Sequence, residues 1–80
     1  MLQEIISEQS TRLANIKLIQ RHAGVVPGEY GNVLQGRGWD VVVFCKISES
    51  TNIRGFRIEE KAAAFGLFED YAQILKDASQ

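Results

Sequence analysis

The feature that most constrains this chain is the segment GWDVVVFCKI at residues 38–47. It is the most apolar run in the sequence and is rich in β-branched and aromatic residues, which favour a buried strand. Side chains alternate across a strand, so Val42 and Phe44 share one face. The odd-numbered residues on the opposite face are Trp39, Val41, Val43, Cys45 and Ile47. Both faces are apolar, and the rest of the chain is expected to cover them.

The length of 80 residues predicts a single domain over residues 1–80. The one cysteine, Cys45, excludes an intramolecular disulfide and suits a reducing compartment. The first residues carry Glu4 and Glu8 instead of a basic segment, so we expect no secretory signal. No apolar run reaches the ~18 residues that a membrane-spanning helix needs. These features predict a soluble, cytoplasmic protein that does not associate with a membrane.

The N-terminal part of the chain, residues 2–23, predicts a helix. Its apolar side chains follow a spacing of three and four residues, Gly24 can cap its C-terminal end, and Pro27 follows three residues later. The spacing is interrupted at residues 9–11, so a second helix that starts at Ser10 is an alternative. Another alternative is a strand over residues 16–20, because short apolar runs are ambiguous. The apolar positions are Leu2, Ile5, Ile6, Leu13, Ile16 and Ile19.

Residues 24–38 hold five of the seven glycines and predict turns around one short strand. The dipeptide Pro27-Gly28 is typical of a turn. Residues 30–34 are the segment that favours an edge strand, because a connection of this length without structure is unusual in a small domain. Whether this third strand forms is left open by the sequence.

Residues 53–58 predict a second strand that returns after a polar turn at residues 48–52. A hairpin that pairs Ile47 with Ile53 brings Phe44 opposite Phe56. The same register brings Val42 opposite Ile58. Aromatic and β-branched cross-strand pairs stabilise a hairpin, so this register is the one expected.

Residues 59–78 predict the C-terminal helix. Apolar side chains at helical spacing form one stripe from Ala64 to Ala78. Glu59 and Glu60 lie in the first turn and Lys76 in the last, as the helix dipole favours. The predicted fold class is therefore α+β, a small antiparallel sheet of two or three strands packed with an N-terminal and a C-terminal helix, in the order α-β(β)-β-α.

The sequence contains no motif that fixes a chemistry, and we expect no enzyme, no cofactor and no metal site. A structural zinc site needs about four Cys or His ligands, and the chain has only His22 and Cys45. Cys45 is expected to be buried in the strand and inert. The glycine-rich segment fits neither of the common phosphate-loop patterns, so it predicts ordinary turns.

The order of features over residues 30–72 resembles the AP2 DNA-binding domain. The resemblance rests on YGNV at residues 30–33, on Trp39 in the next strand, and on GFRIEEKAA at residues 55–63. It implies a three-stranded sheet followed by a helix. That family reads DNA with arginines on its sheet, whereas the central strand here reads VVVF. The resemblance therefore assigns neither a family nor DNA reading to this chain.

The excess of apolar surface predicts a small non-enzymatic protein-interaction or regulatory module that self-associates, most simply as a homodimer. The expected interface residues are Val42, Phe44, Phe56 and Ile58. The alternative function is a nucleic-acid-binding domain that uses the basic end of the hairpin. The net charge of −1 means that such a domain must concentrate its cations locally. The candidate contacts to an anion or to nucleic acid are Arg37, Lys46, Arg54 and Arg57.

Overall fold

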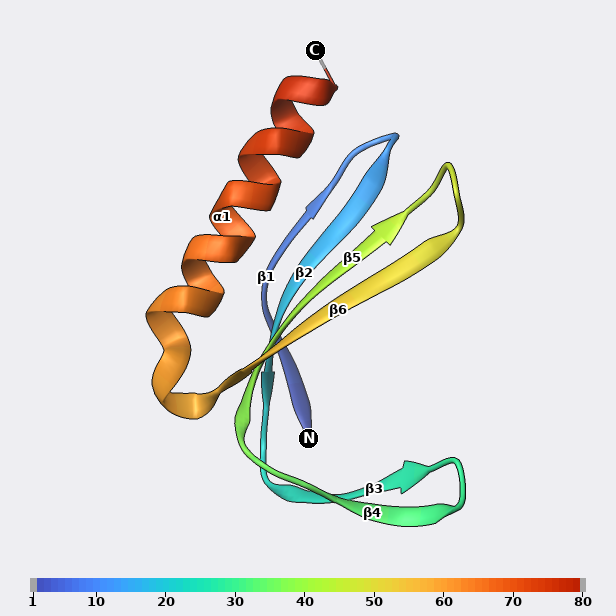
Figure 1. Ribbon diagram of the computed structural model, residues 1–80, viewed down its shortest axis with the longest axis vertical. Coiled ribbons are helices and arrows are strands. Elements are labelled where there is room, and N and C mark those ends of the chain that lie inside the picture. The colour runs from blue at the N-terminus through green and yellow to red at the C-terminus, as the bar shows by residue number, and fades with distance from the viewer. Residues whose placement is uncertain (1, 80) are drawn as a thin grey trace.

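The computed structural model describes residues 2–79, which form six strands, a short 3-10 helix and one C-terminal helix (Figure 1). The strands are β1 (Gln3–Ser10), β2 (Ala14–Arg21), β3 (Gly24–Gly28), β4 (Gly31–Gln35), β5 (Gly38–Cys45) and β6 (Ser50–Arg57). The 3-10 helix η1 (Ile58–Glu60) leads directly into helix α1 (Lys61–Ala78).

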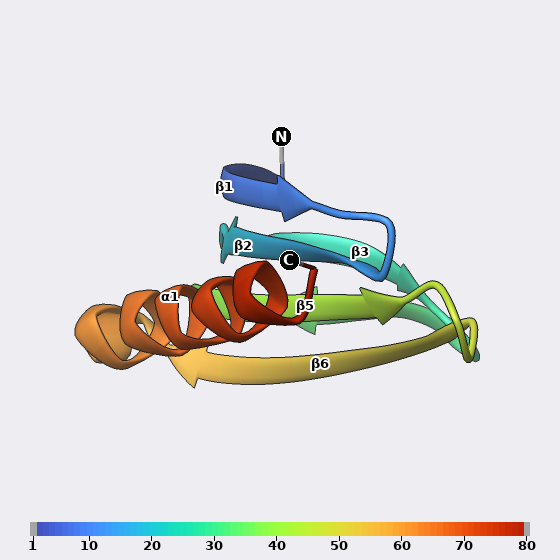
Figure 2. The same cartoon turned by 90° about the horizontal axis from the view of Figure 1, so that it is seen from above.

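Four of these strands form one antiparallel sheet in the order β1-β2-β5-β6. Helix α1 lies along one face of this sheet, and no other element of residues 2–79 packs on the opposite face (Figures 1 and 2). The described residues therefore form a two-layer structure in which α1 covers one face of the sheet.

The hydrophobic core lies between α1 and the covered face of the sheet. Ile16 and Leu18 of β2 are almost fully buried there, as is Val41 of β5. Trp39 lies on the same face and is 5% exposed. The expected alternation of β5 is therefore confirmed, because its odd-numbered side chains up to Val43 contribute to the core. The complete set of buried hydrophobic residues is Ala14, Ile16, Leu18, Trp39, Val41, Ala64, Phe68 and Leu75.

Trp39 joins the sheet to the start of the helix. Its indole Nε1–H donates a hydrogen bond of 3.0 Å to the carbonyl oxygen of Ile58. Its ring meets that of Phe65 edge-to-face, with the centroids 5.4 Å apart, an arrangement that aromatic pairs prefer. The indole thus fixes where η1 ends the sheet and how α1 returns across it. The predicted C-terminal helix is confirmed, with its first residues in η1.

The predicted N-terminal helix over residues 2–23 is wrong. This segment forms β1 and β2, which pair with each other through the turn after Ser10. The alternative strand over residues 16–20 is the correct interpretation, since it lies within β2. Buried Ile16 and Leu18 alternate with the half-buried Lys17, and this period of two outweighs the helical spacing. The long-range pairing of β2 with β5 satisfies its backbone, which no local pattern reveals.

The glycine-rich segment forms a separate two-stranded arm, β3 paired with β4, between β2 and β5. The expected turn at Pro27-Gly28 is wrong, because both residues lie in β3. The turn comes instead at Glu29 and Tyr30, where Gly31 supplies a φ of 120° that favours glycine. The expected short strand exists as β4, but it belongs to the arm and is not an edge of the main sheet.

The register of the β5–β6 hairpin also differs from the expected one. The turn lies at residues 46–49, with Glu49 at a φ of 55°, and Cys45 pairs with Ser50. Phe44 is therefore opposite Thr51, and Phe56 is opposite Trp39. The shift is by an odd number of residues, which moves every side chain of β6 to the other face. The expected Phe44–Phe56 and Val42–Ile58 pairs do not form.

The fold class expected from the sequence is therefore contradicted. The chain has a four-stranded sheet, a two-stranded arm and a single C-terminal helix, and the N-terminal helix is absent from the described residues. Residues 30–72 do contain three strands followed by a helix, the order that the AP2 resemblance implies, but β4 belongs to the arm and the three strands do not form one sheet.

Gly38 is required where β5 begins, because the side chain of Arg21 lies across it. A Cβ atom at Gly38 would collide with the guanidinium group of Arg21 and with the carbonyl oxygen of Phe56. The same guanidinium group donates a hydrogen bond of 3.0 Å to that oxygen. The absent side chain of Gly38 thus lets Arg21 reach from β2 over β5 to β6.

Replacing Gly38 with alanine should therefore displace Arg21 and lower the free energy of unfolding by about 1–3 kcal/mol, the usual cost of overpacking or of a lost charged hydrogen bond. Urea denaturation followed by circular dichroism measures the change. Gly36→Ala is the matched control, since a Cβ there meets nothing within 4 Å, and its effect should stay within about 0.5 kcal/mol. Equal stabilities for the two variants would contradict the placement of Arg21.

Candidate interaction surface

We name the face of the sheet opposite α1 the open face. Its side chains follow from the register, in rows that cross β1, β2, β5 and β6. Their alternation with the buried residues of the core leaves them without cover from any element of residues 2–79. The open face consists of Gln3, Ile5, Glu8, Ser10, Asn15, Lys17, Ile19, Arg21, Asp40, Val42, Phe44, Thr51, Ile53 and Arg57, with Gly38 and Gly55 between them.

Apolar side chains occupy the middle of the open face. Ile5 on β1 is 54% exposed and Ile53 on β6 is 64% exposed. Between them, Ile19, Val42 and Phe44 are only half-buried although they lie on the two central strands. The register pairs Ile5 with Ile19 and Val42 with Ile53, and it places the charged Asp40 and Lys17 beside these pairs. Apolar side chains grouped in this way on an uncovered sheet face are typical of an interaction site.

A shallow hollow of about 270 Å³ lies on this face. Val42 and Phe44 form its apolar part, and Lys17 and two small polar residues complete it. The hollow offers an apolar floor with polar groups at its border, which is the usual composition of a protein-binding surface. Its five lining residues are Asn15, Lys17, Val42, Phe44 and Thr51.

An ion pair lies at the other end of the open face. Arg21 Nε is 3.0 Å from Asp40 Oδ2, with the two side chains 25% and 16% exposed. The Nε–H does not point at the carboxylate, so the contact is electrostatic and not an aligned hydrogen bond. Burial raises the pKa of the Asp40 carboxyl, and the attraction of Arg21 opposes part of that rise. The pair joins β2 to β5 where the arm begins.

The predicted interface residues divide between two places. Val42 and Phe44 lie together on the open face, two residues apart on β5. Phe56 lies on the covered face beside Trp39, and Ile58 follows β6 in η1. Both of the latter pack against the hydrophobic core. Only half of the predicted set can therefore contact a partner through the open face, together with Ile5, Ile19 and Ile53.

The predicted basic residues do not form one site. Arg37 and Arg57 line a common hollow at the end of the sheet that bears the arm. Arg54 projects on the covered side, where it lies 6.0 Å from the centre of the Phe56 ring. Lys46 lies in the β5–β6 turn at the opposite end of β5, and its ammonium donates a hydrogen bond of 2.7 Å to the carbonyl oxygen of Thr11.

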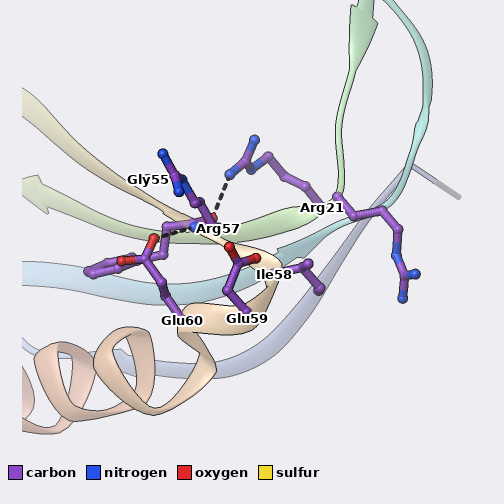
Figure 3. Close-up of a pocket in the computed structure, with 8 residues that line it drawn as sticks. Arg21, Gly55, Arg57, Ile58, Glu59 and Glu60 are labelled. Atoms are coloured by element: carbon purple, nitrogen blue, oxygen red, sulfur yellow. Dashed lines mark hydrogen bonds between the residues drawn. The ribbon is translucent and has the colours of Figure 1, made fainter.

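Arg21 is the cation that the sequence interpretation missed. It lines the same hollow as Arg37 and Arg57, together with the carboxylates Glu59 and Glu60 (Figure 3). The carboxylate of Glu60 accepts a hydrogen bond of 2.8 Å from the backbone N–H of Arg57, which caps η1. The helix predicted for residues 2–23 gave no reason to place Arg21 near these cations, because only the β2–β5 pairing brings Arg21 near β6.

Cys45 is half-buried at the last residue of β5, so the expectation of a fully buried core thiol is wrong. A hydrogen bond from Ser48 in the following turn lowers the pKa of the thiol. Within residues 2–79, no three side chains of His, Cys, Asp or Glu cluster closely enough to hold a metal ion.

Comparison with protein-family models, with curated proteins and with solved structures finds no significant match to this chain. No helix in the described part of the chain combines the length and the apolar character needed to cross a membrane.

The raised pKa of Asp40 gives a testable pH dependence. A folded-state pKa above the ordinary value of 3.8 means that the folded protein binds this proton more tightly than the unfolded chain does. The contribution of Asp40 to stability is therefore lost as the pH rises from 3.8 through the folded-state pKa. Asp40→Asn removes the carboxyl, so the stability of this variant relative to wild type should be greater at about pH 7 than at about pH 4.

Urea denaturation of wild type and Asp40→Asn at both pH values measures this shift. Asp70→Asn, at an exposed position of α1, corrects for the general effect of removing one carboxyl group. A shift in the opposite direction would mean that the attraction to Arg21 outweighs the burial of Asp40.

Proposed function

We propose that this protein is a small non-enzymatic interaction module that binds a second copy of itself through the open face. The observation that carries the proposal is the uncovered apolar surface formed by Ile5, Ile19, Val42, Phe44 and Ile53. The hydrophobic effect favours removing such a surface from water. A second copy offers the same surface, which a twofold axis turns into a self-complementary interface.

The size of the open face supports this assignment. Four strands of eight residues, spaced by about 4.8 Å with a rise of about 3.3 Å per residue, cover roughly 500 Å². Two copies then bury about 1,000 Å² in total, which is near the lower limit for a specific interface. Two sheets packed face to face also give the arrangement of a β-sandwich, with a core about 10 Å thick.

A nucleic-acid-binding site is a second candidate, and the hollow at the end of the sheet favours it. Arg21, Arg37 and Arg57 line this hollow, and cations gathered in one place attract phosphate groups. Within residues 2–79, neither Arg37 nor Arg57 makes an ion pair. Glu59 and Glu60 in the same hollow reduce its positive charge, which is why we place this function second.

For the first candidate, wild-type protein should sediment at high micromolar concentration with twice the mass of the 9.0 kDa chain. Ile53→Glu places a charge in the middle of the interface and should give a folded monomer, because Ile53 is 64% exposed in the isolated chain. Ile47→Glu is the control, since Ile47 is 76% exposed and lies in the β5–β6 turn outside the open face. A monomeric wild type would refute the proposal.

For the second candidate, the protein should be retained on a heparin column at low salt and released at moderate salt. The double variant Arg37→Glu and Arg57→Glu should abolish the retention. Lys46→Glu changes the charge equally per site but lies at the other end of β5, so it should reduce the retention much less. A wild type that passes through the column at low salt would eliminate this candidate.

A further inference from the structure

Several large apolar side chains of the β3–β4 arm are exposed to solvent. Leu34 is 88% exposed and Tyr30 at the tip is 96% exposed. Val25 and Val33 are 56% and 50% exposed. Val25 pairs with Leu34 across the two strands, so the two form one continuous apolar face of the arm.

The base of the arm is held firmly against the sheet. The amide of Gln35 donates hydrogen bonds of 2.9 Å to the carbonyl oxygen of Leu2 and of 2.8 Å to that of His22. Gly24 lies directly under the side chain of Leu2, and any Cβ there would collide with it. These contacts set the direction of the arm, although its outer part projects into solvent.

The arm lies on the side of the sheet that α1 does not cover. Figure 1 shows α1 on one side of the sheet and the arm extending away from it on the other, and Figure 2 agrees. This projection gives the chain a radius of gyration of 13.7 Å, against about 12 Å for a compact chain of this length. The arm and the open face thus lie on the same side of the sheet, away from α1.

We propose that the arm is a clasp that packs against a second copy seated on the open face. This inference rests on the proposed self-association and names the element that completes it. The open face alone provides an interface only at the lower size limit, about 1,000 Å². Each arm spans about 17 Å with two strands spaced by about 4.8 Å. Burying both arms adds several hundred Å² and brings the total toward the standard size of roughly 1,600 Å².

The composition of the arm fits a protein partner and not a phosphate backbone. Across residues 24–35 the only charged side chain is Glu29, at the tip. Phosphate contacts are made mostly by Lys and Arg side chains, which the arm lacks. A single negative charge beside Tyr30 is instead suited to the cations of a partner's open face, where Arg57 is exposed.

Leu34→Glu tests the clasp by sedimentation equilibrium. Leu34 makes little contact within its own chain because it is 88% exposed, so the variant should fold and should dimerise at least tenfold more weakly than wild type. Tyr30→Ser should also weaken dimerisation, and the Ile47→Glu control should not. If Leu34→Glu dimerises like wild type while Ile53→Glu is monomeric, the clasp is refuted and the open-face interface stands. If wild type itself is monomeric, the proposed function is refuted first.

Hydrogen exchange on wild-type protein gives a measurement that needs no variant. On going from low to high protein concentration, the backbone amides of β3 and β4 should exchange more slowly, in parallel with those of β5. Arm amides that exchange equally fast at both concentrations, while those of β5 become protected, would overturn the clasp.

Discussion

The structure depends on the burial of Trp39 under the start of α1. The indole fills the space between β5 and Phe65, and its hydrogen bond to Ile58 fixes the point where the sheet ends and the helix turns back. Lys61 lies 5.8 Å from the ring centre and adds a cation–π contact. Because α1 is directed to this face, no other element of residues 2–79 covers the opposite face. The core and the proposed interface are thus two consequences of the same anchor.

The sequence predicted the parts of the fold that local pattern decides. The alternation in β5 and the stripe of α1 are strong local signals, and both elements formed as expected. The helix predicted for the N-terminal segment was wrong because the apolar positions of this segment satisfy a helical spacing nearly as well as an alternating one. Ile16 and Leu18 are buried by β5 and α1, partners that are distant in sequence and cannot be deduced from residues 2–23 alone.

The candidate site was predictable to the extent that it lies on β5. Val42 and Phe44 belong to the open face whatever the neighbouring strands do, since their orientation follows from alternation. The positions of Phe56 and Arg54 depended on the hairpin register, and a turn with Glu49 at positive φ displaced that register by an odd number of residues. Arg21 and the arm required knowledge of which strands pair, and apolar content at Leu34 and Tyr30 carried no signal for a projecting hairpin.

The arm has a further consequence for the order in which the chain folds. It continues the ladder between β2 and β5: Arg21 pairs with Gly38, Gly24 with Gln35, and Gly28 with Gly31. Joining β2 and β5 directly would require closing a long loop, at an entropic cost that rises with its length. If pairing starts at the tip of the arm and proceeds toward its base, β2 and β5 reach the same register through a series of short loop closures. The arm therefore gives β2 and β5 a stepwise route into register that an unpaired connection of the same length would not give.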